Sequence, residues 1–317
     1  MNILRFPPGE AVPGFDGGLV SSQKANEHIC TSDGQARCSL WWDVVPKIEN
    51  ERIGVIGHFE VGSLDAGLVI LEQAAARLRE RGCTLAVGPM DGNTWRRYRA
   101  VIERGLEPAF FMEPDHPDIL PAVFESAGFF PTARYSSSLV GDLSRGDPRV
   151  GRVRERMDRA GVRIRDIDPL RIEEDLRMIY QVSIVSFAGN YLYTAMSEEA
   201  FLEQYLPFKD KIRPEMVLIA ERDGQAVGYL FGIPDYAEAL RGLPVRTVIA
   251  KTLAILPGRQ FGGLGLLLTA MLHERAQGLG YSRVIHALEH EGKPVGNMSG
   301  YFGKVMRRYA LYSRRLA

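Results

Sequence analysis

A strand–helix–strand unit that occurs twice is the feature that most limits what this chain can fold into. The stretches 67–82 and 265–280 share the same helical pattern and length, and each begins and ends with glycine. A glycine after the last turn is typical of a left-handed helix C-cap. Apolar runs that suit strands flank both stretches, at 52–61 and 84–87 around the first and at 246–255 and 283–288 around the second. The repeat predicts two similar α/β domains.

The chain length agrees with this division, because 317 residues suit two domains of about 150 residues each. A charged stretch with turn residues at 142–160 interrupts the apolar pattern and predicts the boundary. The expected domains are residues 1–150 and 151–317, with 150–160 as a linking helix.

Further elements are expected in the second half. Asp223-Gly224 is a strong two-residue turn signal between apolar runs at 216–222 and 225–232, so these predict a β-hairpin. Helical spacing indicates a helix over 173–187, and Ser197 suits the N-cap of another.

The segment between the second predicted strand and its helix has the composition of an anion-binding loop. Gly262, Gly263 and Gly265 carry no side chain that would block a ligand from the backbone N–H groups opening the helix. A pyrophosphate suits such a helix N-terminus. No Lys-Ser/Thr follows Gly265, which excludes a nucleoside triphosphatase loop, and the third glycine of a dinucleotide fingerprint is missing.

Composition narrows the classes of function. Lys and Arg number 39, as do Asp and Glu, so no overall field would recruit nucleic acid or an acidic membrane surface. The N-terminus lacks a leader pattern, and no apolar run of about 18 residues occurs, so we expect a soluble cytoplasmic protein. Cys30, Cys38 and Cys83 show no metal-ligand spacing, and neither a disulfide framework nor a metal site is predicted.

The order of these elements resembles the GNAT (N-acetyltransferase) superfamily, in particular its two-domain bacterial members. Leu253-Ala-Ile-Leu-Pro257, followed by Gln260, Gly263 and Gly265, fits the pattern that follows the fourth strand in that family. Further similarity lies in 88–94, 112–117, 234–240 and 303–312. The resemblance implies an α/β fold of two tandem GNAT-like domains, each a mixed, mostly antiparallel sheet flanked by helices.

The resemblance also implies an acetyl-CoA-dependent N-acyltransferase that acts on a primary amine of a small molecule or peptide, in a ternary complex and without a metal. The strand backbone would pair with the pantetheine, and the glycine loop would bind the diphosphate, with Arg259 and Gln260 at its mouth. The residues implied are Leu253, Ala254 and Ile255 for the pantetheine, and Arg259, Gln260, Phe261, Gly262, Gly263, Leu264, Gly265 and Leu266 for the diphosphate.

The first repeat is expected to have lost its CoA site. Aligning the two helices by their glycines places Asp65 opposite Gly263 and Gly62 opposite Gln260, with Glu60 nearby. A carboxylate at the helix opening would compete with a diphosphate. This half is predicted to pack against the second and to lend residues of 88–95 to an acceptor cleft, although these also suit an ordinary polar loop anchored by Trp95.

Candidates for proton transfer lie after the last repeat. The family's Asn-x-x-Ala-x-x-x-Tyr spacing fails here, because Lys304 stands where the tyrosine would follow Asn297. Tyr301 is the first candidate for the acid, with aromatic packing as its alternative. His286 and Glu289 are candidates for the base, although a lone histidine on a strand more often has a structural role.

Three further expectations concern side chains around the site. His286 and His290 should share one side of a strand if the strand extends that far. Tyr309 and Tyr312 should face opposite sides of a sheet and be structural. The acceptor cleft should be lined by 186–193 and 235–240, where Asp235 or Glu238 would hold an ammonium group unless they are solvated loop charges.

Two other functions stay open from the sequence. The missing tyrosine and the altered first repeat favour a non-catalytic acyl-CoA-binding or regulatory protein. A transferase that delivers aminoacyl groups to peptidoglycan also uses paired domains of this type, but the intact glycine loop argues against it. The oligomeric state is open.

Overall fold

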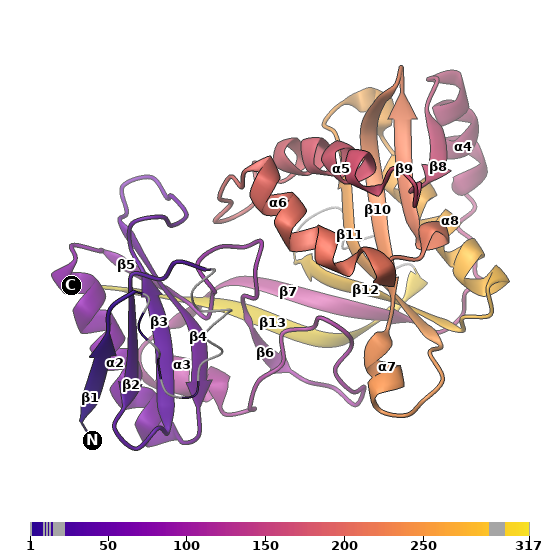
Figure 1. The fold of residues 1–317 in the computed structure, drawn as a ribbon. Helices are drawn as coiled ribbons and strands as arrows, with labels where there is room; N and C mark the ends of the chain where they lie inside the picture. The colour runs from indigo at the N-terminus through magenta and orange to yellow at the C-terminus, as the bar shows by residue number, and fades with distance from the viewer. Residues whose placement is uncertain are drawn as a thin grey trace.

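The fold was analysed in a computed structural model that describes residues 2–8, 10, 12, 14, 23–291 and 302–316. A single sheet of 13 strands runs through the molecule, and helices cover its faces (Figure 1). The strands are β1 (Ile3–Phe6), β2 (Glu27–Thr31), β3 (Ala36–Trp41), β4 (Ile53–Val61), β5 (Leu85–Gly88), β6 (Ala100–Glu103), β7 (Phe130–Val140), β8 (Arg163–Asp166), β9 (Val217–Arg222), β10 (Gln225–Pro234), β11 (Thr247–Ile255), β12 (Arg283–His290) and β13 (Lys304–Arg315).

The helices agree closely with the sequence patterns. They are α2 (Leu64–Glu80), α3 (Leu120–Ser126), α4 (Val150–Arg159), α5 (Ile172–Ser186), α6 (Glu198–Tyr205), α7 (Tyr236–Leu240) and α8 (Leu264–Gly278), with short 3₁₀ turns η1 (Leu206–Lys211), η2 (Pro214–Met216) and η3 (Arg259–Phe261). Gly82 and Gly280 follow the two repeated helices with φ of 79° and 86°, which confirms the predicted left-handed caps. The predicted hairpin, the linking helix and the Ser197 N-cap are also confirmed.

The strand order is β1-β2-β3-β4-β5-β13-β7-β12-β11-β10-β9-β8, with β6 paired to β13 off this path. Among the described strands, only the repeated pairs β4–β5 and β11–β12 are parallel, and the other pairings are antiparallel. The predicted α/β class with a mixed, mostly antiparallel sheet is therefore confirmed.

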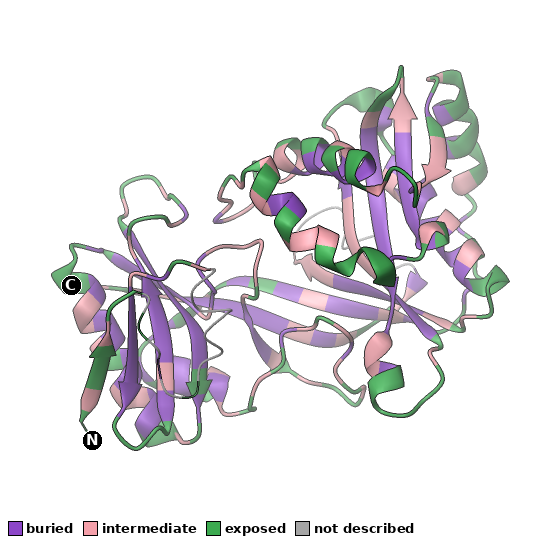
Figure 2. Cartoon of the chain, in the orientation of Figure 1, coloured by how far each residue is buried: buried purple, intermediate pink, exposed green. Residues whose placement is uncertain are grey.

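The two halves do not have separate sheets, because each contributes a strand to the other. The C-terminal strand β13 lies between β5 and β7 of the first half, and β7 pairs in turn with β12 of the second. Both strands cross the middle of the molecule, and each has buried as well as more exposed residues along its length (Figures 1 and 2). A boundary near residue 150 stays a prediction, but the backbone hydrogen bonds of the sheet continue across it.

Helices pack on the sheet in separate places for the two halves. Helices α2 and α3 cover the first half around Phe124 and Tyr312. In the second half, α8 and α4 lie with one apolar cluster and α5 and α6 with another. Tyr309 and Tyr312 are both fully buried and belong to different clusters, which confirms that they face opposite sides of the sheet.

Candidate functional site

The parallel strands β11 and β12 separate part of the way along their length. Their pairing covers Thr247–Ala250 and Arg283–His286 and then stops. Both strands are irregular at this point. The register with β10 shifts so that Lys251 has no partner, and β12 shifts against β7 between His286 and Glu289, where Leu288 has a φ of 59°. Bulges bend a strand locally, and here they coincide with the divergence.

A cavity of about 960 Å³ lies at this divergence. Its walls come from both halves of the chain, so it lies between them. The second half contributes β11, β12 and the start of α8, and the first half contributes residues of 94–99, 112–114 and Tyr135. Cavities of this size suit a small organic ligand.

The backbone of β11 presents an unpaired edge to this cavity. The N–H of Leu256 donates to the Val227 carbonyl of β10 at 2.8 Å. Because backbone groups alternate in direction along a strand, those of Ala254 face β10 and those of Leu253 and Ile255 face the divergence. The Ile255 carbonyl accepts a hydrogen bond from Ser186 Oγ at 2.9 Å. Of the three predicted pantetheine contacts, the backbone of Leu253 and the N–H of Ile255 are therefore the part that faces the divergence without a partner in β10.

The glycine loop brings the N-terminus of α8 to the same cavity. Gly263 is the N-cap with a φ of 86°, and no side chain caps the helix. The first intrahelical bond runs from the Leu267 N–H to the Gly263 carbonyl at 3.1 Å, so the N–H groups of Leu264, Gly265 and Leu266 have no partner within the helix. Phe261, Gly263, Gly265 and Leu266 line the cavity.

The remaining loop residues lie elsewhere. Arg259, Gln260 and Gly262 are exposed, and Leu264 is buried in the apolar core. The Gln260 amide is turned back over the loop, since a Cβ on Gly258 would lie within 2.8 Å of it. Helix α4 supports the loop from outside, where Arg156 donates to the Gly262 carbonyl.

The predicted proton-transfer residues have different surroundings. Tyr301 lies outside the described residues. His286 lines the cavity but is buried, and its Nε2 lies 2.9 Å from His273 Nε2. Burial and the neighbouring His273 lower the pKa of His286 to about 3, so it is a weak base near neutral pH. Glu289 also lines the cavity, and both base assignments stay predictions.

The expectation that His286 and His290 share one side of the strand is wrong. The strand does reach His290, but the bulge shifts its register, so that His286 pairs with Ser138 and His290 with Tyr135. The His290 ring packs edge-on against Tyr135 at 5.1 Å between centroids, whereas His286 stacks on His273.

Of the two segments predicted to line an acceptor cleft, 186–193 lines the cavity and 235–240 does not. Ser186, Phe187, Asn190, Tyr191 and Tyr193 line the cavity, as do Thr94 and Trp95 of the first half. Trp95 is also the anchor that its alternative role required, because its indole N–H donates to the Thr194 carbonyl at 2.7 Å.

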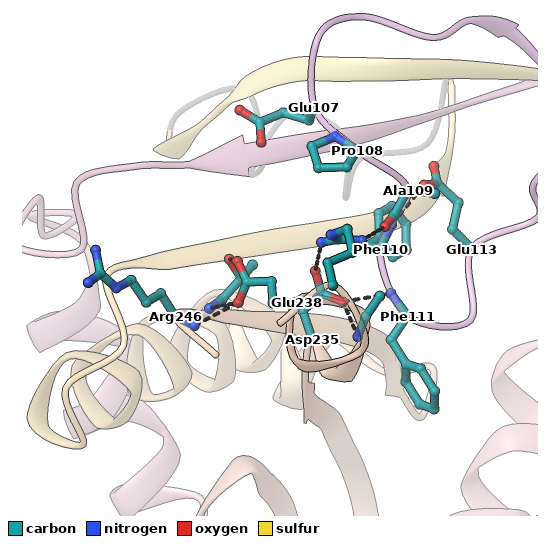
Figure 3. A network of polar contacts seen from close by, with 12 residues as sticks. Glu107, Pro108, Ala109, Phe110, Phe111, Glu113, Asp235, Glu238 and Arg246 are labelled. Carbon is teal, nitrogen blue, oxygen red and sulfur yellow. Dashed lines mark hydrogen bonds and ion pairs between the residues drawn. The ribbon is translucent and has the colours of Figure 1, made fainter. Parts of the chain in front are cut away.

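Asp235 and Glu238 are not in the cavity, so they do not hold a ligand there. Both are buried, and Figure 3 shows them among backbone groups. Asp235 accepts from the Phe111 N–H at 2.7 Å, and Glu238 accepts from the Arg246 N–H at 2.6 Å. These carboxylates fix the segment 107–113 of the first half and the start of β11, which is a structural role.

The comparison of the two repeated helices also needs correction. Helix α2 begins at Leu64 and α8 at Leu264, so Ser63 is the counterpart of Gly263, and Asp65 lies in the first turn. Gly67 lies inside α2, where a Cβ would be 2.5 Å from Val123. The glycine-to-glycine alignment failed because α2 is longer than α8 at its N-terminus.

Sequence reasoning missed Arg99 and Lys251, two cations in the cavity wall. Arg99 donates to the Leu288 carbonyl at 3.1 Å, while Ser137 Oγ accepts from the Leu288 N–H at 3.0 Å. The bulge of β12 is thus held by residues of the first half. A positive φ at Arg99 and Leu288 has no sequence signal, since neither is a glycine or asparagine.

Among the described residues, His, Cys, Asp and Glu side chains form no group of three or more that would hold a metal ion. None of the described helices combines the length and apolar character needed to cross a membrane.

Solved structures of low sequence identity share this fold. A GCN5-related N-acetyltransferase from Sphaerobacter thermophilus has a TM-score of 0.52 at 14% identity, covering 96% of this chain and 83% of its own. A tandem GNAT protein from the clavulanic acid biosynthesis pathway has a TM-score of 0.52 at 12% identity, covering 92% and 83%.

A third similar structure is a GCN5-related glucosamine N-acetyltransferase region in a fungal multi-domain GH3 β-N-acetylglucosaminidase. Its TM-score is 0.55 at 15% identity over 91% of this chain, which spans only 33% of that protein's length. No protein-family model and no curated protein matches the sequence. The chain therefore has the tandem GNAT fold, as its motifs predicted.

Proposed function

We propose that this chain, which has the tandem GNAT fold, is an acyl-CoA-dependent N-acyltransferase with one CoA site, in its second half. The observation that carries the proposal is the coincidence of two features in one cavity: the unpaired edge of β11 and the uncapped N-terminus of α8. The first suits the amides of an extended pantetheine, and the second suits a diphosphate.

The proposed reaction is direct attack in a ternary complex. The acceptor nitrogen forms a bond to the thioester carbonyl carbon, the carbon–sulfur bond breaks, and the thiolate takes up a proton. Glu289 is the base candidate that the surroundings favour, because the lowered pKa of His286 makes its imidazole a poor proton acceptor. Tyr301 stays the predicted acid.

Calorimetric titration with acetyl-CoA tests the binding part of the proposal. We expect one site per chain, and the absence of any binding to the wild-type protein would overturn the proposal. Thiol release with a broad panel of amines tests the chemical part. Tight CoA binding without thiol release for any acceptor would instead favour a non-catalytic acyl-CoA-binding protein.

Side-chain variants test the proposed roles separately. Glu289→Gln removes the base while keeping the size of the side chain, so kcat should fall by about a hundredfold or more, a typical contribution of general base catalysis. Acetyl-CoA affinity, measured by calorimetry, should stay close to that of the wild type. Unchanged kcat would show that another group or water accepts the proton.

A further inference from the structure

Two cations in the wall of the cavity have no carboxylate partner among the described residues. Arg99 comes from the first half and Lys251 from β11, at the point where β11 and β12 separate. Neither forms an ion pair with any described Asp or Glu. This is unusual, because a cation removed from water is normally paired.

Arg99 is held rigidly by its surroundings. Its side chain lies over the rings of both Tyr98 and Tyr135, with the guanidinium carbon 3.8 Å from each ring centroid. Only 5% of the residue is exposed, and its Nε is buried without a hydrogen-bond acceptor. One N–H of the guanidinium is used by the Leu288 carbonyl, so the group keeps donors for a ligand.

Lys251, in strand β11, lines the same cavity. It is the residue that the register shift between β10 and β11 leaves without a partner, and no hydrogen bond or ion pair occupies its ammonium group within the described part of the chain. Burial, and then the charge of Arg99, lower the pKa of Lys251 to about 8. Burial also lowers the pKa of Arg99, to about 10. Both shifts show that positive charge is unfavourable here without an anion.

One carboxylate in the cavity wall, that of Glu113, is already paired. Glu113 lines the cavity, but its oxygens accept from Tyr309 Oη and from the Phe110 N–H, and it pairs with Arg307 Nε at 3.0 Å. It therefore neutralises Arg307 rather than Arg99 or Lys251. Glu113 thus leaves Arg99 and Lys251 without an ion pair, and a ligand carboxylate would find two cationic partners there.

We propose that Lys251 and Arg99 bind a carboxylate carried by one of the two reactants. The inference rests on the proposed function and names its substrate class: either the acceptor is an amino acid, or the acyl group is a dicarboxylic half-thioester. A carboxylate fits better than a phosphate, because one ammonium and a guanidinium that already serves Leu288 suit a single negative charge.

The experiment has one arm for each source of the carboxylate. In the first, acetyl-CoA is fixed, and thiol release is compared for α-amino acids and the amines obtained by removing their carboxylates. In the second, a neutral amine is fixed, and acetyl-CoA is compared with malonyl-CoA and succinyl-CoA. We expect one arm to show a preference of about tenfold or more in kcat/KM for the carboxylate, the effect of a charged hydrogen bond.

The variant Lys251→Met tests whether this preference comes from the cavity. It removes the charge but keeps much of the length of the side chain, and the preference should fall by about tenfold. Rates with neutral reactants should change much less, which a general structural defect would not allow. Lys251→Arg should restore most of the preference. Lys209→Met makes the same change at an exposed lysine outside the cavity and should have no effect.

Failure of this inference can be told apart from failure of the proposed function. Efficient acetyl transfer to neutral amines, without preference for a carboxylate in either arm, would overturn the inference and keep the acyltransferase. Greater efficiency for aminoalkyl phosphates than for the matching amino acids would overturn the assignment to carboxylates.

If acetyl-CoA does not bind at all, the acyltransferase proposal fails, and the inference is tested by calorimetry alone. Saturable binding of the amino acids or of malonate or succinate, lost in Lys251→Met, would support it. The absence of binding for all of them would overturn it.

Discussion

The two halves of the molecule contain the same parallel strand pair, but only the second leaves a gap beyond it. In the first half, β4 and β5 pair over Ile53–Val55 and Leu85–Val87 and then diverge. The chain after β5 fills this divergence. The Met90 N–H donates to the Ile56 carbonyl at 2.9 Å, and the His58 N–H donates to Asp91 Oδ1 at 2.6 Å.

The helices that connect the two strands of each pair, α2 and α8, differ at their N-termini. Ser63 caps α2 by accepting from the Ala66 N–H at 3.3 Å, whereas Gly263 leaves the N-terminus of α8 without a cap. The first half thus satisfies with its own atoms the groups that the second half leaves for a ligand. The two halves thus differ by a short piece of backbone after β5 and by the Ser63 hydroxyl group, more than by the charge of Asp65.

The largest expected effect comes from placing a carboxylate at the open loop. Gly262 has a φ of −56°, which any residue adopts, so Gly262→Asp adds charge without backbone strain, and Gly262→Asn is its neutral control. We expect CoA to bind roughly a hundredfold more weakly to the Asp variant than to the Asn variant, ~2.8 kcal/mol, by calorimetry. Equal affinities would place the diphosphate elsewhere.

Substitution of the cap residue itself, Gly263→Asp, is a less clear test than Gly262→Asp. Gly263 has a φ of 86°, and a Cβ there would lie 3.0 Å from Val153 and 2.8 Å from the Arg156 guanidinium. Gly263→Asp would therefore combine a charge effect with strain against α4, and loss of CoA binding alone could not be attributed to charge.

The next largest effect concerns the first half, where the chain after β5 fills the space between the diverging strands β4 and β5. Asp91→Ala removes the buried acceptor of the His58 N–H, which should lower the free energy of unfolding by ~2 kcal/mol, measured by urea titration. Asp91→Asn keeps an acceptor oxygen and should cost less. CoA affinity should be unchanged in both, and a large loss of affinity would mean that the two divergences are not independent.

Burial lowers the pKa of histidines in both halves, including His28 and His58 of the first. The shifts of His273 and His286 in the second half are larger, so the pH dependence of stability should be strongest there. Burial lowers the pKa of His273 to about 4, from 6.5, and that of His286 to about 3. Between pH 6.5 and 4 the unfolded chain therefore takes up protons that the native state does not. Stability is complete above pH 6.5 and falls as the pH decreases through this window.

The variant His273→Gln removes one of these titrating groups and keeps a hydrogen-bond partner for His286. The slope of unfolding free energy against pH should decrease by about 1.4 kcal/mol per pH unit. The first half has Gly88 at the position that corresponds to His286 in the strand pair. Hydrogen exchange at pH 5 should accordingly show faster opening in the second half, and an unchanged slope in the variant would contradict the assignment.

The smallest effect is expected from Asp65→Asn. Loss of a carboxylate from the first turn of α2 should cost about 0.3–1 kcal/mol of stability through the helix dipole. It should not create a second CoA site, because Met90 still binds the Ile56 carbonyl of β4 and Ser63 still caps the N-terminus of α2. Calorimetry should give one site for both the wild type and the variant. Two sites would show that the charge of Asp65 alone closes the first half.

Local sequence patterns predicted the elements that build the site but not the way they are joined. The glycines after α2 and α8, the Asp223-Gly224 turn and the glycine loop act through neighbouring residues, so short-range signals sufficed. The insertion of β13 between β5 and β7 depends on pairings between distant segments, which no periodicity encodes. The same holds for the contacts of 107–113 with Asp235.

The parts of the candidate site that are formed by the backbone of a local motif were predicted from the sequence. The parts that depend on side chains brought together by tertiary packing were missed. Gly263 and Leu253 were identified from motif spacing. Arg99 was not identified, because its contacts with Tyr98 and Tyr135 join the segment before β6 to the distant strand β7. The burial of His286 against His273 likewise depends on helix packing, and it reverses the chemical meaning of a histidine that looks suitable as a base.

Because β13 lies between β5 and β7, the sheet of the first half can be completed only after the C-terminal strand has been synthesised. Residues near position 310 complete the sheet of a half whose other strands end before residue 141. That half leaves the ribosome with an open edge at β5 and must wait for the whole second half to be made before it closes. Pairings so distant in sequence form slowly, and an exposed edge invites association with other chains. The nascent chain is therefore the state in which this fold has most need of a chaperone.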